Sequence, residues 1–139
     1  MTRKVHATGV IFEDKSGRIL VLKRHSQSRE GETWGLVGGN IENGENKSST
    51  AIRESKEEIG YNIDPSKLEF LKTYHWNQGN QKLNFETFKV RSETDDFIVK
   101  LDVNENTEYM WASPQDLYSR QDLMEGLYPI LEDTYGVRK

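Results

Sequence analysis

The sequence of 139 residues contains no cysteine. This absence excludes a disulfide framework, a thiolate-bound zinc site and a cysteine nucleophile. The sequence also lacks an apolar run close to the roughly 18 residues that a membrane-spanning helix needs. The apolar stretch that follows Arg3 and Lys4 is too short for a signal peptide. We therefore expect a cytoplasmic protein that has no membrane partner.

Proline occurs only three times, whereas the aromatic residues comprise three Trp, six Tyr and five Phe. This balance indicates a packed interior rather than a disordered chain. The length predicts a single domain over residues 1–139. The 19 Lys and Arg residues are outnumbered by 23 Asp and Glu, which gives a net charge of -4. Such a balance disfavours binding of duplex nucleic acid, because that binding depends on neutralising phosphates.

Two apolar runs in the N-terminal third predict a β-hairpin. They cover residues 5–12 and 18–24, and a turn sequence that contains glycine separates them. The second run is apolar without a break over residues 19–22, which is typical of a strand covered on both faces. Residues 25–33 are polar and predict a loop. Residues 34–37 predict a short strand that ends at two consecutive glycines.

A helical pattern runs from Asn46 to Ile59. Asn46 is placed to cap the first turn, and Gly60 stands where a C-terminal glycine belongs. A second amphipathic helix is predicted over residues 122–135, interrupted near its middle by Pro129. Further strands are predicted at residues 68–75, 83–90 and 108–112. Strands mixed with two helices predict an α/β layered domain with a mixed sheet.

Three glutamates, Glu54, Glu57 and Glu58, gather on one side of the first predicted helix. At about 100° per residue, they lie roughly 120° from the apolar face. Like charges at these spacings cost about 0.2–0.5 kcal/mol per pair. One interpretation is a solvated face that Lys47, Arg53 and Lys56 balance. The other is a divalent cation site, since Mg²⁺ and Mn²⁺ prefer oxygen ligands.

The residues around these glutamates follow a fixed spacing. Five residues separate Gly39 from Glu45, and seven separate Glu45 from the segment that starts at Arg53. This pattern resembles the Nudix box, the signature of the Nudix hydrolase family. Ser55 and Tyr61 depart from it, because the family prefers aliphatic residues there. The seven fixed positions of the box are all present: Gly39, Glu45, Arg53, Glu54, Glu57, Glu58 and Gly60.

The resemblance implies an α/β/α sandwich with a central mixed sheet, and a site for Mg²⁺ or Mn²⁺. The three helix glutamates and the backbone carbonyl of Gly38 would bind the metal, and Glu45 would assist from the loop, either through water or by fixing the start of the helix. Arg53 would hold a neighbouring carboxylate by an ion pair. The general base would be either Glu54 or Glu108, an acid that shortly precedes a tryptophan.

Basic and aromatic residues are the candidates for binding substrate. Cations at strand ends would contact phosphates, and a glycine in the loop would let the backbone approach them. Two tryptophans would offer stacking surfaces for a base, although aromatic residues at strand positions are also typical of a core. The substrate-binding candidates are Arg3, Lys23, Arg24, Trp34, Gly39 and Trp76.

The activity that the resemblance implies is hydrolysis of a pyrophosphate bond in a nucleoside diphosphate linked to a further group. The short single domain favours nucleoside triphosphates among such substrates, although the family hosts many of them. A non-catalytic module that binds a nucleotide on the same fold is the alternative. A homodimer is left open by the sequence.

Overall fold

The computed structural model describes residues 3–28, 30–92 and 98–138. The strands in this part of the chain are β1 (Arg3–Glu13), β2 (Ile19–Arg24), β3 (Trp34–Gly35), β4 (Val37–Asn40), β5 (Glu69–Gln78), β6 (Gln81–Arg91) and β7 (Asn106–Ala112). The helices are α1 (Lys47–Ile59), the short 3₁₀ helix η1 (Pro65–Lys67), α2 (Pro114–Tyr118) and α3 (Leu127–Tyr135).

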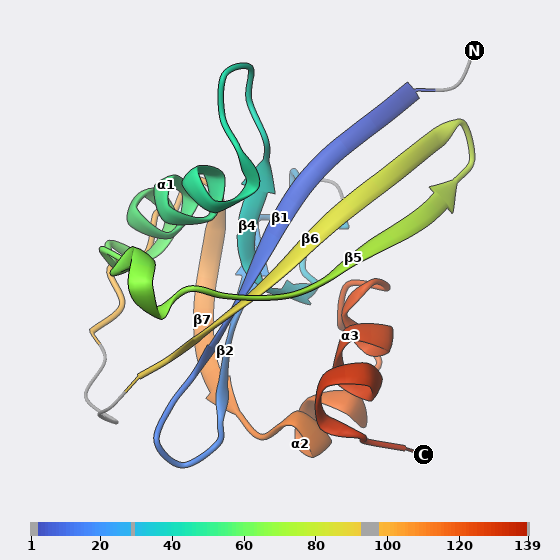
Figure 1. Ribbon diagram of the computed structural model, residues 1–139. Coiled ribbons are helices and arrows are strands. Elements are labelled where there is room, and N and C mark those ends of the chain that lie inside the picture. The colour runs from blue at the N-terminus through green and yellow to red at the C-terminus, as the bar shows by residue number, and fades with distance from the viewer. Residues whose placement is uncertain (1–2, 29, 93–97, 139) are drawn as a thin grey trace.

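The strands form one mixed sheet around β1 (Figure 1). Strand β1 runs parallel to β6 along its whole length and antiparallel to both β2 and β4. Strand β5 continues the sheet beyond β6, and β7 pairs with β2. This arrangement confirms the predicted mixed sheet and the predicted hairpin of the first two strands.

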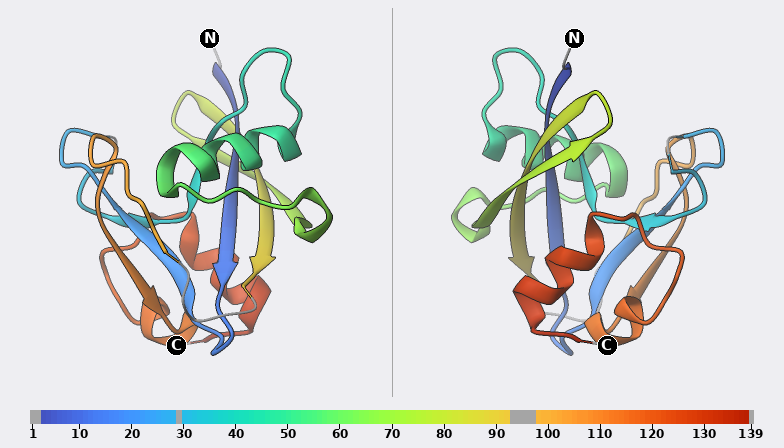
Figure 2. Two further views of the ribbon diagram at one scale, coloured as in Figure 1. Left: turned by 90° about the vertical axis from the view of Figure 1, so that its left-hand side faces the viewer. Right: turned by 90° about the vertical axis from the view of Figure 1, so that its right-hand side faces the viewer.

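The central strands bury both of their faces. On β2, Ile19 and Val21 belong to the core on the side of α2 and α3, whereas Leu20 and Leu22 belong to the core under α1. The alternation follows from the two-residue period of a strand. Figure 2 shows α1 and α3 on opposite sides of the sheet, as expected for the α/β/α layers. The prediction of a strand covered on both faces is therefore confirmed.

Helix α1 begins and ends where the sequence indicates. The Asn46 side chain accepts a hydrogen bond from the Ser49 amide at 2.8 Å, and the Ser49 hydroxyl accepts one from the Asn46 amide at 3.0 Å. These bonds satisfy two backbone donors at the start of the helix. Gly60 ends the helix with a left-handed φ of 70°, a conformation that glycine adopts without a Cβ penalty.

The C-terminal helix is shorter than predicted. Residues 122–126 are not helical, because the Trp34 amide donates to the Asp122 carbonyl at 2.9 Å and the Met124 amide donates to the Trp34 carbonyl at 2.8 Å. Helix α3 therefore begins at Leu127, and Pro129 lies in its first turn, where proline breaks no helical hydrogen bond. Helix α2 was not predicted, although Ser113 before a proline is a typical cap.

The strand before the first helix is also different from the prediction. Strand β4 continues through Gly38 and Gly39 to Asn40 instead of ending at the glycines. It pairs with β1 so closely that a Cβ on Gly38 would lie 2.0 Å from the Thr8 carbonyl oxygen. The two glycines thus allow β4 to dock beside β1. Among the described residues, the helices are all too short or too polar to cross a membrane.

Candidate active site

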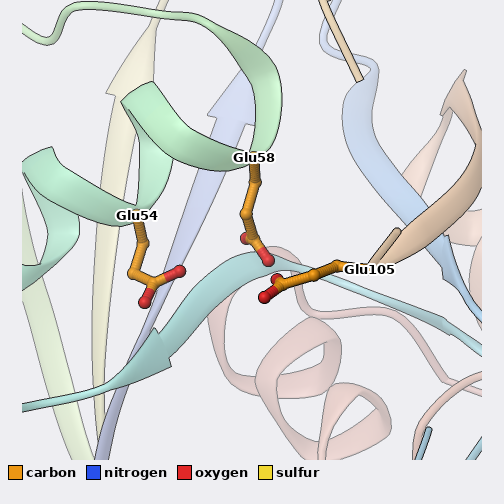
Figure 3. A group of neighbouring side chains, drawn as sticks. All are labelled: Glu54, Glu58 and Glu105. Carbon is orange, nitrogen blue, oxygen red and sulfur yellow. The ribbon is translucent and has the colours of Figure 1, made fainter. Parts of the chain in front are cut away.

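Three carboxylates meet beside strand β4. Glu54 and Glu58 extend from α1. Glu105, the residue just before β7, points toward them (Figure 3). One oxygen from each of the three lies within 4.8 Å of the others. Glu54 and Glu58 are buried, and Glu105 is exposed, so the cluster is open on one side. We call these three residues the carboxylate cluster.

Glu105 was not among the predicted site residues. The segment before it is fixed to the end of α1, because the Lys100 amide donates to the Ile59 carbonyl at 2.9 Å and the Asp102 amide donates to the Glu58 carbonyl at 3.1 Å. The Glu105 amide then donates to the Asp102 carbonyl at 3.1 Å. The unpaired carbonyls at the end of a helix need such donors. The hydrogen bonds to α1 join residues that lie far apart in the sequence, so the sequence pattern of the box could not reveal the position of Glu105.

Glu108, the predicted late acid, lies elsewhere on the sheet. Its carboxylate forms a 3.3 Å ion pair with Lys23, its cross-strand neighbour, and its side chain is 59% exposed. Among the described residues, the structure places Glu105 rather than Glu108 beside the helix glutamates. The chain turns into β7 at Asn106, so Glu108 already belongs to that strand and lies outside the carboxylate cluster.

Burial controls the protonation of the two inner carboxylates. Burial raises the pKa of Glu58 to about 9, although a 2.8 Å hydrogen bond from the Gly38 amide opposes the shift. Burial also raises the pKa of Glu54 to about 7, against the opposing charge of Arg53. Neither Glu58 nor Glu105 forms an ion pair with any cation in the described part of the chain. Burial without a neighbouring cation therefore favours the protonated form of the Glu58 carboxyl in the metal-free protein.

Arg53 connects the carboxylates that surround the cluster. Its guanidinium binds Glu45 at 2.7 and 3.0 Å, Glu54 at 2.9 Å and Glu57 at 3.2 Å. The hydrogen bonds from Arg53 lower the pKa of Glu45 to about 2. Glu45 thus fixes the loop to the helix, one of the two roles expected of it. Glu57 is 56% exposed and points to Arg53, so it lies outside the cluster with which it was predicted to converge.

Strand β4 brings the cluster next to a cavity of about 210 Å³. Gly39 lines this cavity, and a Cβ on Gly39 would lie 2.4 Å from Oε1 of Glu54. Gly38 lines it too and donates its amide hydrogen to Glu58. The cavity lies on the α3 face of the sheet, since Leu127 and Ile130 also line it. The two glycines therefore contact both the carboxylate cluster and the cavity.

The cavity has an aromatic wall and a polar edge. Trp76 lines it, and its ring stacks on Phe85 at a centroid distance of 5.6 Å. Arg24 also lines it, and its buried Nε has no hydrogen-bond partner in the described structure. Three of the six predicted substrate-binding residues thus lie together here, namely Arg24, Gly39 and Trp76.

The other three candidates are placed differently. Trp34 is 7% exposed and packs in the core against residues of α2 and α3, which corrects its prediction as a stacking surface. Lys23 forms an ion pair with Glu108, and it lies on β2 next to Arg24, which lines the cavity. Arg3 is exposed at the start of β1, where its amide donates to the Asn80 carbonyl. These three residues are not among the described residues that line the cavity.

The donor set of the cluster fits a divalent cation. Mg²⁺ and Mn²⁺ are bound by carboxylate oxygens, and the raised pKa values of Glu54 and Glu58 reflect a charge that a cation would balance. The fit thus rests on three convergent carboxylate oxygens, whose ionised form a bound cation would favour.

Comparisons with known proteins agree with this geometry. The family model of the NUDIX domain matches residues 3–134. The chain is 25% identical over 136 residues to a CTP pyrophosphohydrolase of Escherichia coli (strain K12), covering 98% of this chain and 95% of that protein. It is 30% identical over 61 residues to an 8-oxo-dGTP diphosphatase of Proteus vulgaris, covering 44% of this chain and 54% of that protein. Two further relatives are matched over 31% and 13% of their own length.

Solved structures show the same fold. The crystal structure of a MutT protein from Methanosarcina mazei Go1 superposes with a TM-score of 0.81 and covers 95% of this chain and 93% of its own. The two sequences are 21% identical, so this likeness concerns the fold alone.

Proposed function

Because the chain belongs to the NUDIX domain family, we propose that it is a pyrophosphohydrolase that cleaves nucleoside diphosphates linked to a further group, nucleoside triphosphates among them. The observation that carries this proposal is the contact of the carboxylate cluster, through Gly38 and Gly39, with a cavity that has an aromatic wall. A nucleotide needs both features, one for its phosphates and one for its base. The similarity to a CTP pyrophosphohydrolase over nearly the whole chain supports the triphosphate class.

Glu54, Glu58 and Glu105 would hold Mg²⁺ or Mn²⁺ in this proposal. A bound divalent ion lowers the pKa of water and neutralises charge on phosphate oxygens. Arg53 keeps Glu45 and Glu54 in place by its ion pairs. The carbonyl of Gly38 and the exposed Glu57 remain further proposed ligands.

Glu54 is the better candidate for the general base. Arg53 donates to its Oε1, which leaves Oε2 as the atom that would take a proton from the attacking water. The alternative candidate, Glu108, is engaged by Lys23 and is mostly exposed.

Substrate would lie across β4 in this proposal. Arg24 offers a buried Nε that has no hydrogen-bond partner among the described residues, and it would bind a phosphate group. Gly39 lets the phosphates approach the backbone. Trp76 would stack on the base. Arg24, Gly39 and Trp76 thus each have one proposed contact with substrate, and a single substitution at each position can test that contact.

The test is a panel of nucleoside triphosphates, nucleoside diphosphate sugars and dinucleotides incubated with Mg²⁺, with Mn²⁺ or with EDTA. We expect a nucleoside monophosphate and pyrophosphate from a triphosphate, and no product in EDTA. Glu58→Gln should abolish turnover, whereas Lys56→Gln, an exposed change on the same helix, should keep it. Absence of product across the whole panel would overturn the proposal. Nucleotide binding without turnover would support the non-catalytic alternative.

A further inference from the structure

Glu30 stands at the edge of the cavity in an unusual backbone conformation. Its φ is 51°, a left-handed value that is uncommon for residues other than glycine. The Glu30 carbonyl accepts a 3.3 Å hydrogen bond from the Thr33 amide and another from the Thr33 hydroxyl. Its carboxylate Oε1 accepts a 3.3 Å hydrogen bond from the Glu125 amide. Both ends of the residue are therefore fixed, and strained residues of this kind are concentrated at functional sites.

The surroundings of this carboxylate are mostly apolar. Among the described residues that line the cavity, Glu30 supplies the one carboxylate and Arg24 the one cation. Most of the other side chains in this lining are apolar, Leu83, Phe85 and Trp76 among them. Within the described structure, Glu30 forms no ion pair, and its Oε2 accepts no hydrogen bond. A carboxylate oxygen that accepts no hydrogen bond from the described residues is available to a ligand that brings a donor.

We propose that Glu30 selects nucleotides whose base carries an exocyclic amino group. This inference rests on the proposed function, because it assigns the base edge of the nucleotide in the same cavity. An ionised carboxylate only accepts hydrogen bonds. The amino group of cytosine or adenine donates to Glu30 while the base stacks on Trp76. The carbonyl oxygen of uracil or hypoxanthine at the same ring position faces Glu30 with lone pairs, and the nearest donor of these bases is shifted to the neighbouring ring nitrogen.

The expected size of this preference can be taken from other protein sites that bind the edge of a base. A good contact to a base edge discriminates by roughly 5-fold to 150-fold, and a site built to bind a donor rejects analogues that lack it. We therefore expect the ratio of kcat/KM for CTP over UTP, and for ATP over inosine triphosphate, to be roughly tenfold or more. In each pair, the amino group is replaced by a carbonyl oxygen, the neighbouring ring nitrogen gains a hydrogen, and the phosphates are unchanged.

The test compares these two pairs in the wild-type protein and in Glu30→Gln. The amide oxygen of glutamine still accepts from the Glu125 amide, so the loop keeps its anchor, and the amide nitrogen can donate to a carbonyl. We expect both ratios to fall toward one in Glu30→Gln, through a loss for CTP and ATP and a gain for UTP and inosine triphosphate. Glu32→Gln is the matched control, because Glu32 is exposed, has a φ of 63° and is not among the residues that line the cavity.

Equal ratios in the wild-type protein, or ratios that Glu30→Gln leaves unchanged, would overturn the inference. Affinities for the same four nucleotides are measured by calorimetry in parallel. If the wild-type protein binds but hydrolyses none of them, the proposed activity fails while the binding ratios still test Glu30. If turnover is normal and the ratios do not respond, the proposed activity stands and the role of Glu30 is wrong.

Discussion

The α-carbon of Gly39 lies directly against the carboxylate of Glu54. A Cβ at Gly39 would stand 2.4 Å from Oε1 and 2.5 Å from Cδ of that side chain. Real Cβ atoms do not come closer than 3.0 Å to other atoms, so a Cβ at this position would push the end of the Glu54 side chain away. The identity of one residue on a strand thus sets the position of a carboxylate on the helix that packs over it.

Gly39→Ala should therefore displace Glu54 and lower kcat by at least about tenfold, since an error of about 1 Å at a reacting centre costs up to about 100-fold. The measurement is steady-state hydrolysis with saturating Mg²⁺. Gly44→Ala is the control, because Gly44 has a φ of 85° and no atom within 4 Å of an added Cβ. It should cost about 1 kcal/mol of stability through backbone strain and leave kcat near the wild-type value. Equal effects of the two changes on kcat would refute the contact as its cause.

Arg53→Lys should show whether the catalytic carboxylates need the shape of the arginine side chain or only its positive charge. Arginine binds Glu45 through two nitrogens while a third contacts Glu54, and a lysine cannot reproduce that fork. We expect kcat to fall by roughly tenfold or more, with the midpoint of thermal unfolding lowered as the loop loses its anchor. Lys56→Arg, on the exposed face of the same helix, should change neither quantity. An active Arg53→Lys protein with wild-type kcat would mean that the ion pairs do not position the catalytic carboxylates.

The sequence predicts local features of this site well and tertiary ones poorly. The cap of α1 at Asn46 and its end at Gly60 depend on residues next to each other in the chain, and both are found where the pattern indicates. The position of Glu105 depends on hydrogen bonds from residues 100 and 102 to the end of α1, which no spacing in the box encodes. Trp34 illustrates the same limit, because a strand aromatic faces either a ligand or the core depending on what packs over it.

Glu105→Gln and Glu108→Gln should behave differently. Glu105 shares the carboxylate cluster, so its loss should weaken metal binding and lower turnover by about 10-fold to 100-fold. Glu108 is exposed and pairs with Lys23, a surface contact worth about 0–1 kcal/mol, so its loss should leave turnover within about twofold. Titration of activity with Mg²⁺ measures both effects. The reverse order of sensitivities would restore Glu108 as the late acid of the site.

The buried carboxylates also set how the stability of the metal-free protein depends on pH. Burial raises the pKa of Glu58 to about 9 and that of Glu54 to about 7, above the ordinary value of 4.5. Between about pH 4.5 and pH 9, the folded state therefore binds more protons than the unfolded state. The stabilising contribution is fully present below the unfolded pKa and is lost as pH rises through the folded values.

In EDTA, the free energy of unfolding in urea should thus decrease from pH 5.5 to pH 9, by on the order of 5 kcal/mol. Glu58→Gln should flatten this slope, because an amide does not titrate, whereas Glu57→Gln, which removes an exposed carboxylate of the same helix, should keep it. Saturating Mg²⁺ should raise the stability most at high pH, because a bound cation favours the ionised carboxylates. A stability that rises with pH in EDTA would show that Glu58 is ionised in the folded protein without a metal ion.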